Sequence, residues 1–200
     1  MLGSVALRRH HYESAFEAYL RRRRIPYVAV DEAKKALLPA AAPCSRLNSL
    51  KSFDFVVYGQ SGNLLAEVKG RRVHSHRTEC WVTRDDVESL ARWEQLFGPG
   101  FDAAFIFVYW FEGQPPDAQF HEVFPHADRW YALRTVRACD YARAMRTRSR
   151  AWGTVDLSRE AFDRLSAPFA PQASRLHIGD AVPALEVLDA LETRGLSIGV

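Results

Sequence analysis

The chain has 200 residues, a length that suits one ordinary domain and is short for two. Apolar residues make up 48% of it and charged residues 26%, which is typical of a globular protein and excludes disordered and collagen-like chains. The longest apolar stretch, residues 103–111, is much shorter than the ~20 residues that a transmembrane helix needs.

Cysteine usage and the first residues indicate the compartment. Cys44, Cys80 and Cys139 are an odd number at wide spacings, which argues against a disulfide framework and fits a reducing environment. Arg8 and Arg9 come before any long apolar segment, so no secretory signal is expected. We therefore expect a cytoplasmic protein that does not bind membranes.

The net charge is only +3, but the positive charge is concentrated. Three clusters hold much of it: Arg21 to Arg24; Lys69, Arg71, Arg72 and Arg77; and Arg134, Arg137, Arg143, Arg146, Arg148 and Arg150. A guanidinium group matches the geometry of phosphate, so clustered arginine indicates a polyanionic partner. For any single cluster a salt-bridged surface is the simpler interpretation, and only the three together favour nucleic acid. The expected contacts are Arg71, Arg72, Arg146, Arg148 and Arg150.

The chain begins with a predicted amphipathic helix over residues 4–24, which Pro26 ends. Its apolar face consists of Tyr12, Phe16, Tyr19 and Leu20, at spacings of three and four. A short strand at 27–30, a helical turn at 33–38 and a loop at 39–43 follow. Two β-rich runs, residues 53–58 and 64–69, flank the turn-forming residues 59–63 and predict a hairpin.

The rest of the chain alternates strands and helices. Thr83 is a predicted N-cap, and the helix after it ends at Gly98. The expected elements after it are a central strand at 103–111, strands at 120–124 and 131–136, a helix at 140–146, a short helix capped by Ser158, and a helix at 182–191. A mixed sheet flanked by helices on both sides follows, hence an α/β fold. We expect one domain over residues 1–167, then a linker and a helical tail over 168–200.

The hairpin carries the residues best suited to chemistry. Glu67 and Lys69 are two apart on one strand and share a face. A loop of two residues, 61–62, or of four, 60–63, places Asp54 opposite Lys69, with Glu67 on the diagonal, whereas a loop of five turns Asp54 to the other face. The turn residues favour the even loops. Two carboxylates beside a lysine suit a metal-assisted phosphodiester hydrolase, although a plain cross-strand ion pair is the alternative.

The same residues resemble the active-site pattern of the PD-(D/E)XK nuclease superfamily. Ser52-Phe53-Asp54, twelve residues and then Glu67-Val68-Lys69 follow a helix that bears Glu13, although Phe53 replaces the motif proline. The resemblance implies a restriction-endonuclease-like fold from about residue 4 to residue 111. It also implies metal ligation by Asp54, Glu67 and Glu13, and catalysis involving Asp54, Glu67 and Lys69.

A longer set of residues resembles the bacterial HYExAFE family, a likeness that indicates no particular substrate. The set comprises His11 to Leu20, Lys51 to Asp54, Val68 to Arg71, Trp81 to Thr83, and Arg148 to Trp152.

Two glutamates on the first helix compete for the role of third ligand. Glu17 points towards Arg21 and Arg24, which lie four and seven residues on, so it has a structural explanation. Glu13 lies at the edge of the apolar face, beside Phe16, and its position has a weaker structural explanation than that of Glu17. The sequence thus predicts a Mg²⁺-dependent endonuclease, with Mn²⁺ as a substitute, that acts on DNA or another structured nucleic acid. A catalytically inactive binding or assembly module is the alternative, and a homodimer is left open.

Overall fold

The computed structural model describes residues 3–30, 50–59, 62–73, 78–113, 120 and 122–169, with the side chains of the first helix described from His11 onward. The predicted elements at 33–38, 39–43 and 182–191 lie outside these residues, as does the predicted tail beyond Phe169. None of the described helices is long and apolar enough to cross a membrane.

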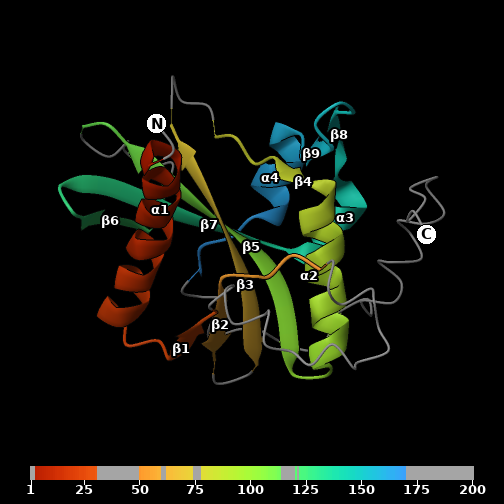
Figure 1. Ribbon diagram of the computed structural model, residues 1–200, viewed down its shortest axis with the longest axis horizontal. Coiled ribbons are helices and arrows are strands. Elements are labelled where there is room, and N and C mark those ends of the chain that lie inside the picture. Colours follow the sequence, from red (N-terminus) through yellow and green to blue (C-terminus); the bar gives the residue numbers. More distant parts are fainter. Residues whose placement is uncertain are drawn as a thin grey trace.

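Six strands form the main sheet, in the order β1-β2-β3-β5-β7-β6 (Figure 1). Their bounds are β1 Tyr27–Ala29, β2 Phe55–Tyr58, β3 Asn63–Arg72, β5 Phe101–Phe111, β6 Val123–His126 and β7 Arg129–Arg137. The pair β3 and β5 is parallel and all other neighbours are antiparallel. Helix α1 (Gly3–Arg22) precedes the sheet, and α2 (Arg84–Phe97) lies in the crossover from β3 to β5. The expected α/β fold, a mixed sheet flanked by helices, is confirmed.

Helices cover both faces of this sheet. Because side chains alternate along a strand, Leu64 and Ala66 of β3 pack with Phe16 of α1, whereas Leu65 packs with Val87 of α2. The predicted central strand is β5, which lies between β3 and β7 and is buried along most of its length. The molecule therefore has two apolar cores, one on each side of the sheet.

Helix α2 begins and ends as its sequence predicts. The Thr83 side chain accepts a hydrogen bond from the backbone N–H of Asp86, and the Asp86 side chain accepts one from the backbone N–H of Thr83. This capping box satisfies two N–H groups that a helix start leaves without partners. Gly98 ends the helix with a φ of 75°, a conformation that glycine adopts without strain.

A second, three-stranded sheet stands beside α2, in the order β4-β9-β8. Its strands are β4 Val82–Thr83, β8 Arg146–Ser149 and β9 Thr154–Asp156, and the helices α3 Ala138–Ala144 and α4 Arg159–Leu165 flank it in the chain. Ser158 caps α4 as expected, with its hydroxyl accepting from the N–H of Ala161. The predicted helix at 140–146 is wrong at its end, because Arg146 pairs with Asp156 in the β8–β9 ladder.

The register of the predicted hairpin needs one correction. Tyr58 pairs with Asn63 and Phe55 with Ala66, so the loop has four residues, 59–62, and starts one residue earlier than expected. Continuing this register places Asp54 opposite Glu67 and not opposite Lys69. The parity is unchanged, so all three side chains lie on the α2 face of the sheet. The predicted strand at 120–124 also starts later, at Val123.

Candidate active site

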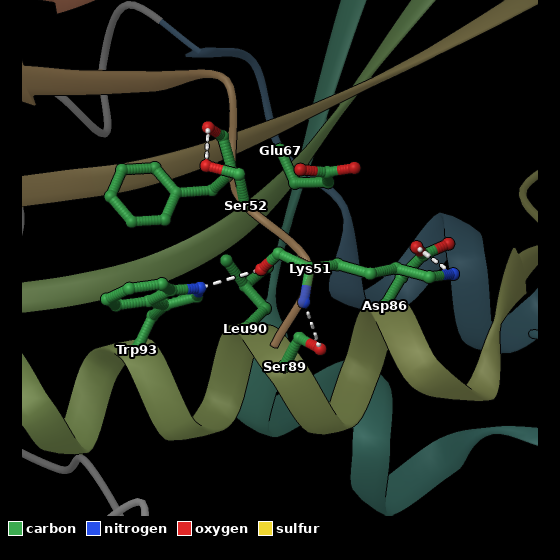
Figure 2. A pocket seen from close by; sticks show the side chains of 8 residues that line it. Lys51, Ser52, Glu67, Asp86, Ser89, Leu90 and Trp93 are labelled. Carbon is green, nitrogen blue, oxygen red and sulfur yellow. Dashed lines mark hydrogen bonds and ion pairs between the residues drawn. The ribbon is translucent and has the colours of Figure 1, made fainter. Parts of the chain in front are cut away.

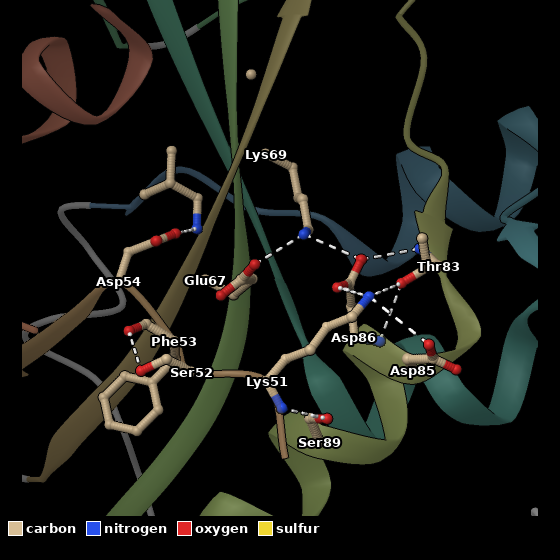
Figure 3. Close-up of polar contacts among 12 residues, drawn as sticks. Lys51, Ser52, Phe53, Asp54, Glu67, Lys69, Thr83, Asp85, Asp86 and Ser89 are labelled. Atoms are coloured by element: carbon tan, nitrogen blue, oxygen red, sulfur yellow. Dashed lines mark hydrogen bonds and ion pairs between the residues drawn. The ribbon is translucent and has the colours of Figure 1, made fainter. Parts of the chain in front are cut away.

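Asp54 stands where the chain enters β2, and its backbone and side chain are both held by β3 (Figure 3). Its N–H donates to the carbonyl oxygen of Ala66 at 3.0 Å, and its Oδ2 accepts a hydrogen bond from the N–H of Val68 at 2.6 Å. β2 does not extend along β3 beyond Ala66, so the Asp54 side chain takes up a backbone donor that the missing partner strand would have bonded. This contact fixes one carboxylate beside the strand that carries Glu67 and Lys69.

Glu67 and Lys69 form a nearly buried ion pair. Glu67 Oε1 lies 2.7 Å from Lys69 Nζ, and the two side chains are only 14% and 15% exposed. Burial and the negative charge of Glu67 raise the pKa of Asp54 to about 8. Burial also raises the pKa of Glu67, and the Lys69 charge only partly offsets this. Two carboxyl groups that share one buried site therefore cost free energy when both are ionised.

The lysine is held as a cation. Burial acts to lower the pKa of Lys69, but the charges of Glu67 and Asp86 outweigh burial and raise it. Lys69 Nζ lies 3.0 Å from Asp86 Oδ2, so carboxylates stand on two sides of the ammonium group (Figure 3). A fixed ammonium group donates hydrogen bonds and stabilises negative charge, and this arrangement favours orientation of a water or phosphate over proton abstraction.

Asp86 is a member of the site that sequence reasoning missed. It is 8% exposed, and its pKa lies at about 2 because the charge of Lys69 and the hydrogen bonds from Thr83 outweigh the effect of burial. The signal in the sequence was the capping pattern Thr83-x-x-Asp86, which explained Asp86 as part of a helix start. Only the fold shows that the same carboxylate reaches Lys69 on another element.

Lys51 extends this ionic chain and was also missed as a member of the site. Its Nζ lies 3.1 Å from Asp86 Oδ1 and 2.9 Å from Thr83 Oγ1. Its backbone is held by α2, since its N–H donates to Ser89 Oγ and its carbonyl oxygen accepts from Trp93 Nε1 (Figure 2). A small pocket with room for about one water molecule lies here. Its lining consists of Lys51, Ser52, Phe53, Glu67, Asp86, Ser89, Leu90 and Trp93.

The two glutamates of α1 are in different surroundings. Glu17 Oε1 lies 2.6 Å from Arg21 and also accepts a hydrogen bond from the Tyr27 hydroxyl at 2.7 Å. Glu13, by contrast, is close enough to Asp54 for its negative charge to raise the pKa of that carboxyl. The structure thus brings Glu13 towards the hairpin carboxylates and gives Glu17 the ion pair that the sequence predicts.

The expected nucleic-acid contacts are dispersed, and several already have protein partners. The Arg71 guanidinium stacks over Trp81, 4.1 Å from the ring centroid, and donates to the carbonyl oxygen of Gly70. Arg72 pairs with Glu112 and lies over Trp110. Two arginines of β8 also pair with acids, Arg146 with Asp156 at 2.9 Å and Arg148 with Glu79 at 3.3 Å. Arg150 is exposed, and it takes part in no ion pair within the described part of the chain.

A divalent cation fits the donor set of this site, although the site is not arranged around one. Among the described residues, no group of three or more His, Cys, Asp and Glu side chains converges as metal ligands do. Glu67 is turned to Lys69 and Asp54 to a backbone N–H. The raised pKa of Asp54 nevertheless marks a buried pair of hard oxygen donors whose repulsion a cation would relieve.

Comparison with known proteins finds likeness in structure and not in sequence. No known protein family matches this sequence, and no curated protein matches it. Among solved structures, the chain is similar to Hjc, a Holliday junction resolvase from the archaeal hyperthermophile Archaeoglobus fulgidus. The TM-score is 0.48 at 15% sequence identity, and the match covers 82% of this chain and 93% of that chain. The function of the site is therefore inferred from its own residues.

Proposed function

We propose that this protein is a metal-dependent nuclease that hydrolyses phosphodiester bonds in DNA. The observation that carries the proposal is the buried pair of carboxyl groups, Asp54 and Glu67, beside the held ammonium group of Lys69. Burial and mutual repulsion both oppose the ionisation of these two carboxyl groups. Such strained pairs of like charges are typical of catalytic centres and not of surface ion pairs. The motif around these residues supports membership of the PD-(D/E)XK superfamily and, more narrowly, of the HYExAFE family.

In this proposal each residue has a separate task. Asp54 and Glu67 hold Mg²⁺, with Mn²⁺ as a substitute, and Glu13 on α1 is a third metal ligand. When bound, Mg²⁺ supplies Lewis-acid assistance to phosphodiester hydrolysis. Lys69 donates to the attacking water or the scissile phosphate from a position that Asp86 holds in place. Asp86 does not touch the reacting atoms and is a positioning residue.

The test is cleavage of single-stranded, duplex and branched DNA with Mg²⁺ or Mn²⁺. Asp54→Asn and Glu67→Gln should each abolish cleavage, because an amide keeps the shape of the side chain but is a poorer metal ligand. Circular dichroism should show that both variants keep the fold. A matched control is Asp163→Asn, which neutralises a side chain that is 54% exposed on α4. Wild-type protein that cleaves none of these substrates with either metal contradicts the proposal.

A second candidate is a non-catalytic module that binds nucleic acid with the same fold. The 2.7 Å ion pair between Glu67 and Lys69 favours it, because this pair occupies a carboxylate that the metal would need. Titration calorimetry with Mn²⁺ separates the two candidates. Heat of binding that Asp54→Asn removes supports the nuclease, whereas DNA binding without any Mn²⁺ binding supports the module.

A further inference from the structure

The hairpin formed by β8 and β9 carries an exposed aromatic side chain that the proposed function does not use. Trp152 is 81% exposed, the most exposed of the large apolar side chains in the described part of the chain. Burying a side chain of this size is worth about 2 kcal/mol or more, so folding alone gives no reason for a tryptophan at this position. Its exposure points to a ligand.

The backbone of the hairpin tip is fixed. The N–H of Trp152 donates to Ser149 Oγ at 3.4 Å, and the N–H of Gly153 donates to the carbonyl oxygen of Arg150 at 3.3 Å. Gly153 has a φ of 56°, which closes the turn without strain. These contacts order the backbone of the turn, and a tryptophan side chain has only two torsion angles to fix, so stacking of a flat ligand on Trp152 costs little conformational entropy.

The same tip is joined to the candidate active site at two junctions, and the first is with the start of α2. The carbonyl oxygen of Gly153 accepts a hydrogen bond from the N–H of Arg84 at 2.8 Å, and Thr154 pairs with Thr83. Thr83 in turn contacts Lys51 and Asp86, the residues beside Lys69 (Figure 3). The tip therefore adjoins the start of α2, where the ionic chain of the site begins.

The second junction reaches the catalytic strand. Arg148 of β8 and Arg71 of β3 both lie over the ring of Trp81, at 5.1 and 4.1 Å from its centroid. Arg71 is two residues beyond Lys69 on the same strand. The hairpin thereby contacts both α2, which carries Asp86, and β3, which carries Lys69.

The charge of the hairpin fits a polyanion. Arg146, Arg148 and Arg150 lie on β8 and the turn after it, and Arg150, next to the tip, is exposed. In a regular duplex each base is already stacked on both sides, whereas an unpaired base offers a free π-face to an aromatic ring. An exposed tryptophan among arginines therefore suits a strand with unpaired bases better than an intact duplex.

We propose that the β8–β9 hairpin selects DNA with unpaired bases, with Trp152 stacking on one such base and Arg150 contacting the adjoining phosphate. This inference rests on the proposed function for its substrate class. It adds that the substrate is single-stranded or locally unpaired at the position next to the active site.

The experiment measures binding without cleavage. Fluorescence anisotropy in the presence of EDTA compares a labelled single-stranded oligodeoxynucleotide with the matching duplex. Wild-type protein should prefer the single strand, and Trp152→Ala should weaken single-strand binding by roughly 5- to 100-fold, the range that stacking on one base gives, with little effect on the duplex. Trp152→Phe should restore much of the preference, because it keeps a ring.

Trp130→Ala is the matched control, since Trp130 is also exposed, at 37%, but lies on β7 away from the hairpin. It should leave the ratio of single-strand to duplex affinity unchanged. The inference is overturned if Trp152→Ala keeps the wild-type ratio, or if the variant changes only the sedimentation coefficient, which would assign Trp152 to contact with a second copy of the chain. Absence of cleavage with Mg²⁺ despite a Trp152-dependent preference would contradict the nuclease proposal and leave the binding inference standing.

Discussion

Asp54 shows how one buried carboxyl group links the candidate chemistry to stability. Its pKa is raised to about 8 by burial and by the charge of Glu67, whose own pKa is also raised, so ionising both carboxyl groups at neutral pH is unfavourable without a cation. Ionisation then has to be driven by a positive charge. Binding of a divalent cation and loss of the Asp54 proton are therefore expected to be coupled.

This raised pKa predicts how stability changes with pH in metal-free buffer. Between pH 3.8, where an ordinary Asp ionises, and about 8, the folded protein binds a proton at Asp54 that the unfolded chain has lost. The contribution of Asp54 to the free energy of unfolding should therefore fall as pH rises through this window, by about 1.4 kcal/mol per pH unit at most. Thermal melts at a series of pH values measure the effect.

Asp54→Asn is the control for that experiment, because it removes the titration and keeps the shape. Glu94, whose pKa burial raises to about 7, adds a dependence of the same sign, and it is present in both proteins. The difference between the melting curves thus reports Asp54 together with its coupling to Glu67. Wild-type and variant melting temperatures that run parallel across the window would contradict the raised pKa.

The two glutamates of α1 provide a second prediction at this scale. Glu13→Gln should impair metal-dependent cleavage, because it removes a carboxylate that we propose as a metal ligand, and an amide is a poorer one. Glu17→Gln should leave cleavage intact and cost only a few tenths of a kcal/mol, the typical contribution of a helix ion pair. Cleavage rates and urea unfolding of the two variants check this, and equal loss of activity in both would refute the assignment.

At the scale of elements, α1 and β3 touch where the strand has no side chain. A Cβ atom added at Gly70 would overlap the ring of Tyr12. Gly70→Ala should therefore force the ring or the helix outward and cost about 1–3 kcal/mol, as overpacking does. Urea unfolding measures the loss, and adding Tyr12→Ala should recover part of it. A Gly70→Ala protein as stable as wild type would show that the ring moves aside freely.

The β8–β9 hairpin carries the prediction about phosphate binding. Changing Arg146, Arg148 and Arg150 together to alanine should flatten the dependence of DNA affinity on salt, by about 0.7–0.9 in the logarithmic slope for each phosphate that the variant no longer neutralises. Arg146 and Arg148 must exchange Asp156 and Glu79 for phosphate, so Arg150 should contribute most. Arg159→Ala on α4 is the control, with a side chain 82% exposed. An unchanged slope in the triple variant would make this cluster a structural surface.

Elements with strong local signals could be predicted from the sequence, and contacts between elements could not. The periodicity of α1 and the capping residues of α2 are local, and both helices were predicted close to their observed bounds. The hairpin register was wrong by one loop position, because several residues in 59–63 suit a turn. Arg146 was assigned to a helix because nothing local shows its pairing with Asp156 in β9.

The residues of the candidate site also fall into those that the sequence predicts and those that only tertiary contacts bring together. Asp54, Glu67 and Lys69 were proposed from their spacing on a hairpin together with their resemblance to the PD-(D/E)XK pattern, and the observed register places them on one face. Asp86 and Lys51 were missed because they reach the site through tertiary contacts, from the start of α2 and from the segment before β2. Their local roles, a helix cap and a surface lysine, gave no reason to look further.

At the scale of the whole molecule, the last described residues pack against the first helix and bury part of its apolar face. Phe169 is fully buried against Phe16 and Tyr19, and its N–H donates to Glu122 Oε2 at 2.6 Å. Glu122 also accepts a hydrogen bond from the Tyr19 hydroxyl, across 103 residues of sequence. The core on the α1 face thus joins both ends of the described chain.

This closure has a consequence for the order of events during synthesis. Helix α1 leaves the ribosome before the other described elements, yet part of its apolar face packs against Phe124, Leu133 and Phe169, which emerge much later. Contacts so far apart in sequence form slowly, and the nascent helix stays open to chaperones or to misassociation until they do. A fragment that stops after Phe111 would contain every residue of the candidate catalytic site and still lack part of the surface on which α1 packs.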